Sequence, residues 1–486
     1  MTGNVRILAM TTDLGDVGPL KGMIGSLPDE VLLEMFRFYV DGEDVETWLT
    51  LVHVCRRWRS VVFASPHRLN LRLLFKGETP VMEMLTIWPE FPIVISPSPT
   101  FWKLETPQVE IADNVIAALD HRDRVCHITF TAISFPSSKL ERLVAMMQYP
   151  FPELTHLHLQ FWFADGTAAV IPDSFLGGSA PHLRTLLLTD IVFPALPKLL
   201  LSTGNLVKLS LLYIPNAGYI SPEVMATALS SLARLETFDL GFLSPRSRPP
   251  RESRRPPRIA PAVLPALTRF SFRGVSEYVE DFVSRIDTPQ LNFVYITFFN
   301  QLIFYISQLP HFANRVRKFE VLDQADVTFW DKSAEVVLSM KTGTVRHRRL
   351  VLKIPCTEAD WQLSSLAQVC SLSLPPFSTL ENLRIDNSLP SGQDDMEHSQ
   401  WLELLYPFTT VKHLYLREEV WLHVAIAMRE LDGESITQVL PALQNLSIKG
   451  LQPSGPTWDA VESFVSTRQR FGCPIAVHRR EESDTE

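Results

Sequence analysis

Apolar residues recur along most of the chain in one short template, in which an apolar residue is followed by two others three and five positions later. The segments FPELTHLHL (151–159) and APHLRTLLL (180–188) show this template clearly. Each match ends in alternating apolar and polar residues, which is typical of a β-strand with one buried face. The template begins at Val125, Leu154, Leu183, Leu206, Leu235, Leu267, Leu291, Val316, His347, Leu380, Val411 and Leu443.

Helical patterns lie between these predicted strands. The segment SPEVMATALSSL (221–232) has Pro222 in its first turn and apolar residues at helical spacing. Further helices are predicted at 277–286, 360–369, 399–406 and 421–431. One strand and one helix in each unit of roughly 29 residues resembles the leucine-rich repeat, whose units must stack because none buries its apolar face alone. The predicted fold is an α/β solenoid, a curved parallel sheet with helices on the outer side.

The match to regular leucine-rich repeats is incomplete. The position after each strand, where that family usually has Asn or Cys, is irregular here, and the spacing varies from 23 to 33 residues. A doubly wound sheet would also alternate strands and helices, but many short strands that share one template favour a solenoid. The segments TWDAVESFVSTRQRF (457–471) and PIAVH (474–478) predict a terminal helix and strand that close the open end.

Residues 23–75 form a different module. Three short helices are predicted, in MIGSLPDEVLLEMFRFY (23–39), VETWLTLVHV (45–54) and CRRWRSVVFA (55–64). The first has Pro28 in its first turn, Asp29 and Glu30 beside the positive end of the helix dipole, and almost no polar side. A helix that is apolar all round is normally buried on every side, either by its own protein or by a partner.

The segments LPDEVLLEMFRFY and LTLVHVCRRWRSVVFASP resemble the F-box, which starts with Leu-Pro and contains a Val-Cys-basic-basic-Trp segment. The residues in register with that pattern are Leu27, Pro28, Leu32, Phe36, Leu51, Val54, Cys55, Arg56, Arg57 and Trp58. Combined with degenerate repeats, this module makes the chain similar to the large basidiomycete family of F-box proteins.

The F-box resemblance implies a partner and a function. F-box modules dock on a Skp-family linker subunit of a cullin-RING ubiquitin ligase, and the downstream domain selects the substrate. The chain is therefore expected to be a substrate-recognition adaptor of an SCF-type ligase, without catalytic activity or cofactors of its own. The candidates for the linker contact are Leu27, Pro28, Leu32, Phe36, Leu51, Val54 and Trp58. Some of these must instead hold the three helices together.

Charge and cysteine content restrict the possible function classes. The 486 residues carry a formal charge of −9, which argues against wholesale nucleic-acid binding. The five cysteines are scattered and never spaced as C-x-x-C, as expected in the reducing cytoplasm or nucleus. No signal peptide or membrane span is predicted.

Motifs for phosphate cradling, a nucleophile elbow or a zinc protease are absent from the sequence. His156 and His158 lie two apart on one strand and would face the same way, but no third metal ligand is evident. Cys55 has no catalytic histidine placed with it in the sequence, so a small packing residue is expected there.

Two polar ends and one insert flank or interrupt these domains. Disorder is predicted for the leader (1–22) and the tail (479–486), and the solenoid of about twelve repeats is assigned to 76–478. The insert 244–261 has six arginines and six prolines against one acid, which predicts a solvated loop. Two alternatives to the adaptor remain open: an F-box scaffold without a role in turnover, and a repeat protein that binds nucleic acid through this insert.

The polar positions of the later strands are mainly basic. From Leu267 onward they hold eleven positive charges against Glu320, Glu381 and Asp386. In the repeat template these positions line the concave side, where arginines can bind acidic or phosphorylated peptides. The alternative is that they merely face water. The expected substrate face comprises Arg317, Lys318, Arg348, Arg349, Arg384, Lys412 and Arg417.

Overall fold

The computed structural model describes residues 27–40, 45–76, 80–96, 108–133, 137–161, 168–246, 261–319, 322–340, 349–371, 379–387, 398–429, 431, 435, 437–451 and 455–480. The predicted leader 1–22, most of the arginine-proline insert (247–260), Arg348 and the tail from 481 lie outside this part of the chain. No described helix is long and apolar enough to cross a membrane.

Three helices form the amino-terminal module, and their boundaries agree with the sequence patterns. They are α1 (Asp29–Val40), α2 (Thr47–Val54) and α3 (Arg56–Ala64). Asp29 and Glu30 in the first turn of α1 complement the positive end of its dipole. Leu32, Leu33 and Phe36 bury one face of α1 against the other two helices.

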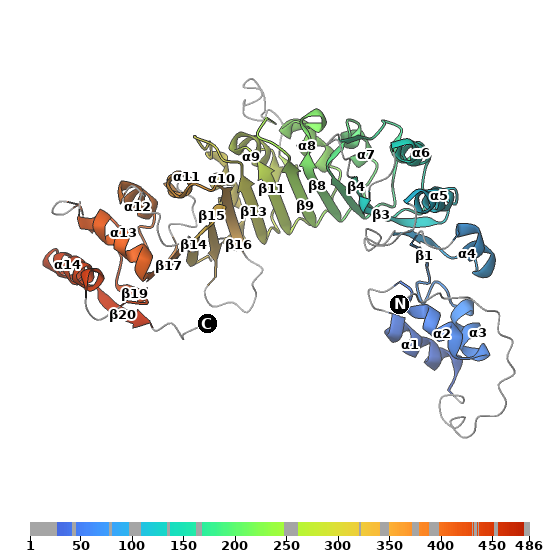
Figure 1. Cartoon of the computed structure of the whole chain (residues 1–486), viewed down its shortest axis with the longest axis horizontal. Helices are drawn as coiled ribbons and strands as arrows, with labels where there is room; N and C mark the ends of the chain where they lie inside the picture. Colours follow the sequence, from blue (N-terminus) through green and yellow to red (C-terminus); the bar gives the residue numbers. More distant parts are fainter. Residues whose placement is uncertain are drawn as a thin grey trace.

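A sheet of sixteen described strands follows, drawn out along one direction with most helices on its outer side (Figure 1). Its strands up to the middle are β1 (Leu73–Phe75), β2 (Ile93–Ile95), β3 (Val125–Ile133), β4 (His156–Phe161), β6 (Thr185–Thr189), β8 (Lys208–Ile214), β9 (Thr237–Phe242), β11 (Arg269–Gly274) and β13 (Phe293–Phe298). The others are β14 (Gln324–Trp330), β15 (Ser333–Ser339), β16 (Arg349–Pro355), β17 (Asn382–Asn387), β18 (His413–Arg417), β19 (Asn445–Lys449) and β20 (Ala476–Arg480). Two small parallel pairs lie beside it, β5 (Ala169–Val170) with β7 (Ile191–Val192) and β10 (Ala262–Val263) with β12 (Ile286–Asp287).

The helices of the solenoid alternate with the strands, as the sequence predicts. In the amino-terminal half they are α4 (Val81–Ile87), α5 (Gln108–Leu119), α6 (Ser137–Met146), α7 (Leu196–Leu200), α8 (Pro222–Leu229) and α9 (Ser276–Val283), with 3-10 turns η4 (Phe175–Gly178) and η5 (Asn216–Gly218). In the carboxy-terminal half they are α10 (Gln308–Arg315), η7 (Arg317–Phe319), α11 (Ala359–Ser371), α12 (His398–Leu405), α13 (Glu418–Arg429) and α14 (Pro456–Arg470). The predicted terminal helix and strand are confirmed as α14 and β20, which pairs with β19. Arg479 and Arg480, which the sequence analysis assigns to a disordered tail, belong to β20 because they pair with Ile448 and Lys449.

Eleven of the twelve template matches lead into a strand of this sheet. The match at Val316 is wrong, because it ends α10 and continues into the 3-10 turn η7. The strand starts after Leu322 instead, where Ala325 and Val327 complete the same template and are fully buried. Arg317 and Lys318 therefore lie on a turn and not on a strand.

An antiparallel hairpin interrupts the parallel progression. β14 and β15 are antiparallel, as are β15 and β16, whereas β16 pairs with β13 and β14 pairs with β17 in parallel. After β13, the next strand in the chain, β14, lies three positions further along the sheet. The two strands that follow, β15 and β16, occupy the positions between β14 and β13. The sequence analysis predicts a wholly parallel sheet, and this segment corrects it.

The boundary between the two modules lies earlier than the sequence suggests. Leu73–Phe75, which the sequence analysis assigns to the amino-terminal module, pair with Ile93–Ile95 as the first strand of the sheet. Strand burial alternates regularly, as in β4, where Leu157, Leu159 and Phe161 point toward the helices. The intervening polar residues face the concave, helix-free side.

Gly274 at the end of β11 is confined by aromatic rings, and this generates a stability prediction. A Cβ at Gly274 would lie 2.6 Å from Phe272 Cζ and 3.1 Å from Phe242 Cδ2. The Phe272 ring is buried and contacts the rings of Phe242 and Tyr278, so moving it would disturb both. We expect Gly274→Ala to lower the free energy of unfolding by about 1–3 kcal/mol, as overpacking usually does.

Chemical denaturation followed by circular dichroism measures this change, with Gly241→Ala as the matched control. A Cβ at Gly241 on neighbouring β9 would meet its nearest atoms at 3.5 Å, which is ordinary contact. The control should be neutral or slightly stabilising, because alanine restricts the unfolded chain. Equal stability of the two variants would contradict the predicted clash.

Candidate functional site

Helix α1 has two apolar faces, and only one of them is buried within this chain. Val31, Met35 and Phe38 follow one another at spacings of four and three residues, so they share one side of the helix. All three are exposed, and the Phe38 side chain is 83% exposed. The opposite side carries the buried Leu32, Leu33 and Phe36. A helix with apolar residues on its solvent side has surface that a partner can cover.

Helix α2 extends this exposed apolar surface. The Tyr39 and Thr50 hydroxyls lie 3.1 Å apart in a hydrogen bond that joins the end of α1 to α2. Val54, four residues after Thr50 and therefore on the same side of α2, is 58% exposed. We call the surface formed by Val31, Met35, Phe38, Tyr39 and Val54 the α1–α2 face.

The seven residues expected at the linker contact differ in their burial. Leu32, Phe36 and Leu51 are buried in the module's own core, where Phe36 lies 4.7 Å from the Trp58 ring between centroids. They hold the helices together and are not available as contact surface. Pro28 and Val54 are exposed, whereas Leu27 and Trp58 are half-buried.

Sequence reasoning missed Val31, Met35, Phe38 and Tyr39 as contact candidates. The signal was present, because positions 31, 35 and 38 are one apolar stripe and 32, 33 and 36 are another. Without coordinates nothing distinguishes the stripe that packs internally from the one that faces outward.

The basic residues of the F-box segment fix the helix arrangement. Arg57 on α3 donates to the Asp29 carboxylate at 2.7 Å and also to the Leu27 carbonyl, so it ties α3 to the start of α1. Arg59 donates to the Val52 carbonyl at 2.9 Å. Cys55 is exposed, and its Sγ accepts the Trp58 backbone N–H at 3.5 Å. Cys55 therefore caps α3, and the expectation that it packs in a core is wrong.

An aromatic cluster joins the three-helix module to the solenoid. The Trp48 ring on α2 contacts Trp88 and Phe91 edge-on at centroid distances of 5.3 and 5.6 Å. Phe63 on α3 lies 6.4 Å from Trp88 and 6.0 Å from Phe91. The Trp48 indole N–H also donates to the Arg72 carbonyl at 3.0 Å. The module is thus packed against the segments that lead into the first two strands of the sheet.

The predicted basic substrate face is not one continuous surface. Lys318 lies on the η7 turn and donates to the Gln290 carbonyl at 3.0 Å, and Arg317 lies beside it. Lys412 is paired with Glu381 at 2.5 Å. Arg417 is paired with Asp386 at 3.3 Å.

Two further residues of that face, Arg349 and Arg384, do lie on the concave side, on β16 and β17. The β14–β15 hairpin brings Asp326 and Glu335 between them, an acidic contribution that the sequence reasoning did not anticipate. The part of the concave face that runs from β15 to β18 in the sheet is therefore largely neutralised.

Three histidines gather at the other end of the concave face. His156 and His158 share one face of β4, as predicted, and His127 on β3 stacks on His156 at 5.1 Å with ring planes 8° apart. Burial is the main cause that lowers the pKa of His127 to about 4, and the neighbouring His156 and Arg72 lower it further. Burial also lowers the pKa of His156 and His158. Among the described residues no trio of potential ligands is placed to hold a metal ion.

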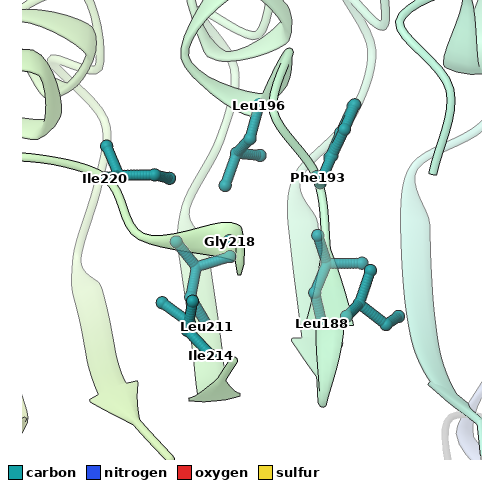
Figure 2. A pocket seen from close by; sticks show the side chains of 8 residues that line it. Leu188, Phe193, Leu196, Leu211, Ile214, Gly218 and Ile220 are labelled. Carbon is teal, nitrogen blue, oxygen red and sulfur yellow. The ribbon is translucent and has the colours of Figure 1, made fainter. Parts of the chain in front are cut away.

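A small pocket between β6, β8 and α7 offers no chemistry. Figure 2 shows that apolar side chains such as Leu188, Phe193 and Leu196 surround it. All of its lining side chains belong to the buried core. It is a gap in the packing on the helical side.

A family model of F-box-like domains matches residues 24–69. No curated protein matches the chain. Among solved structures, the leucine-rich repeat-containing protein LegL7 from Legionella pneumophila is similar over 81% of this chain and 96% of its own, with 12% identity and a TM-score of 0.26. Residues 24–69 are therefore an F-box-like domain. The described chain is a mixed α/β structure in which these helices precede a long, mainly parallel sheet whose strands alternate with helices.

The histidine group predicts a pH dependence of stability. The pKa of His127 is about 4 in the folded chain against 6.5 when unperturbed, so protons bind the unfolded state first. Stability should therefore be lost as the pH falls from about 6.5 to about 4. His127→Gln should reduce this loss, measured as the fall in melting temperature between neutral and acidic pH.

The exposed His67 serves as the matched control, because it lies outside this cluster. His67→Gln should leave the acid-induced fall in melting temperature as it is in the wild type. The same fall in the wild type and in His127→Gln would contradict the role of His127.

Proposed function

We propose that this protein is a substrate-recruiting adaptor of an SCF-type cullin-RING ubiquitin ligase. The observation that carries the proposal is the α1–α2 face, an exposed apolar surface on a domain that is F-box-like. F-box domains generally bind Skp-type linker subunits, so this face is the candidate for the linker contact. In this function the chain supplies proximity between a substrate and the ligase, and the ligase supplies catalysis.

Burial energetics support an apolar partner. Covering a side chain such as phenylalanine or methionine contributes about 1.5–3 kcal/mol, so the five residues of the face provide a substantial driving force. Of the predicted contact residues, Val54 and Pro28 remain candidates at the interface, with Leu27 and Trp58 at its border. Leu32, Phe36 and Leu51 act indirectly, by holding α1 and α2 in place.

The geometry allows the linker and the solenoid to be engaged together. On α2, Trp48 packs toward the solenoid, and Thr50 is about 200° further round the helix. The α1–α2 face is consequently separate from the aromatic cluster that joins the two modules. A linker bound to this face would leave the concave side of the sheet accessible to a substrate.

The remaining parts of this proposal follow from the F-box resemblance. We place the protein in the cytoplasm or nucleus, and we retain the similarity to basidiomycete F-box proteins as a prediction. An F-box scaffold that binds the linker without directing turnover is the competing function. Faster degradation of captured proteins when this chain is expressed distinguishes the adaptor from that scaffold.

Reversing the polarity of the α1–α2 face should abolish linker binding. Phe38→Asp places a charge where an apolar contact is proposed, and loss of such an anchor typically costs at least about 2 kcal/mol, or about 30-fold in affinity. Affinity purification with quantitative mass spectrometry, after proteasome inhibition, measures recovery of the Skp-family subunit. The helices should stay folded, because Phe38 points into solvent.

Met82→Asp on α4 is the matched control, since Met82 is 68% exposed but lies outside the face. It should retain the linker. Leu32→Ala should instead destabilise the module by about 2–5 kcal/mol, which is a folding effect. Undiminished linker recovery with Phe38→Asp would refute docking at this face.

A further inference from the structure

Four cations on the concave face form a rectangle across three neighbouring strands. Arg269, Phe293 and Arg349 are aligned in one row of β11, β13 and β16, and Arg273, Thr297 and Lys353 are aligned in another. Two strand spacings separate the cations within each row by about 10 Å, and four residues separate the rows by about 13 Å. Tyr295 lies in the middle row, between Ser271 and Val351.

The aromatic rings on β13 orient this group. The Arg269 guanidinium lies 4.4 Å from the centroid of the Phe293 ring, so it leans from β11 toward β13 along one edge of the rectangle. The Phe293 and Tyr295 rings are stacked at 6.4 Å with planes 3° apart. These contacts use the faces of the guanidinium and the rings, and they leave the hydrogen-bond donors of Arg269 at the edge of its plane.

Arg273 is held in a similar way. Its guanidinium lies 5.0 Å from the Tyr213 ring and 5.7 Å from the Phe299 ring. Its Nε is buried, so an anion on the concave face would meet the terminal nitrogens of the guanidinium instead.

The acids near the rectangle leave most of its charge unpaired. Lys353 is 4.0 Å from Glu335, which is a loose contact. Asp239 on β9 lies between Lys208 and Arg269, and it accepts a hydrogen bond from Ser210. Asp326 on β14 has Arg384 and Arg349 near it. These three acids lie on strands outside the rectangle. Asp239 is on the β11 side, and Glu335 and Asp326 are on the β16 side.

We propose that the rectangle of Arg269, Arg273, Arg349 and Lys353 around Tyr295 binds a phosphorylated serine or threonine in an extended segment of a substrate protein. This inference rests on the proposed adaptor function, because it names the class of substrate that the adaptor recruits. It also replaces the basic face expected from sequence, of which only Arg349 belongs to the rectangle.

Charge and shape favour a phosphopeptide over other anions. A phosphomonoester carries a charge of about −1.5 to −2 and three acceptor oxygens, so one group can engage arginines from both outer strands. A nucleic acid presents phosphates at short intervals, and Asp239, Asp326 and Glu335 would meet the next ones along. A peptide has one such group, and its neighbouring residues can avoid or complement these acids.

The direct test compares short degenerate peptide pools that are identical except for a central serine or phosphoserine. Binding to the full-length chain is measured by fluorescence anisotropy. The phosphoserine pool should bind at least about tenfold more tightly, the effect expected of one charge-assisted hydrogen bond or more. Equal affinity for the two pools would overturn the proposal.

Charge reversal locates the site. Arg269→Glu combined with Arg349→Glu should reduce binding of the phosphoserine pool to the level of the serine pool. Replacing both by lysine should give an intermediate loss, because lysine keeps the charge but not the planar fork. The matched control is Arg417→Glu, which reverses a cation of the same face that is already paired with Asp386. Phosphate preference that survives the double reversal, or that is lost in the control, would place recognition elsewhere.

Two competitors separate this ligand from other anions. Inorganic phosphate that competes as well as the phosphoserine pool would indicate a simple anion site, and RNA that binds more tightly would indicate a nucleic-acid surface. Either result would overturn the phosphopeptide proposal.

Linker capture by each variant is measured in parallel and should be unchanged, which also confirms folding. Failure of the wild type to capture a linker would remove the adaptor function, while a phosphate preference located at the rectangle would stand by itself. The two proposals can therefore fail separately.

Discussion

The structure depends on the continuity of one apolar layer between the sheet and its helices. A single repeat exposes too much apolar surface to be stable, so each strand must place its inward side chains against those of the next. Among the described residues this layer is one cluster that extends from Leu32 in α1 to Ile475 before β20. Its ends are closed differently. The F-box-like helices cover the first strands, and α14 covers the last, with Arg468 donating to the Val439 and Leu440 carbonyls.

The same requirement explains why the irregular segments do not disrupt the solenoid. The β14–β15 hairpin reverses the strand direction but keeps the alternation of buried and polar residues in register with β16 and β17. Helix α9 is buried along its whole length, and its Glu280 is accommodated because its carboxylate caps α10 through the Leu309 N–H at 2.8 Å. Burial raises the pKa of Glu280, and these hydrogen bonds oppose that rise. The buried carboxylate of Glu280 thus satisfies backbone N–H groups at the start of α10.

Packing fixes the residues of the inner layer but not those that face outward. The outward residues of the F-box-like helices and of the concave sheet can therefore differ in chemistry. On the F-box-like helices the outward residues include the apolar α1–α2 face. On the concave sheet they are polar and charged, and their pairing decides their chemistry. Glu381 and Asp386 pair with the basic residues of the last strands, whereas the arginines of β11 contact aromatic rings. The aromatic cluster of Trp48, Trp88 and Phe91 holds the two surfaces on one body.

The sequence determined the repeat, the three amino-terminal helices and the eleven strands whose template is local, because burial of alternate residues is recorded directly in the order of the side chains. It also determined that α1 had more apolar surface than one core needs. Only the tertiary structure decided which stripe of α1 is internal. Leu32 and Met35 are both apolar in the sequence, but in the structure Leu32 is buried and Met35 is exposed. The hairpin, the pairing of Lys412 with Glu381, and the alignment of Arg269 with Arg349 across β13 were likewise beyond the sequence. These features depend on which strands become neighbours, and strand order is set by packing between residues far apart in the chain.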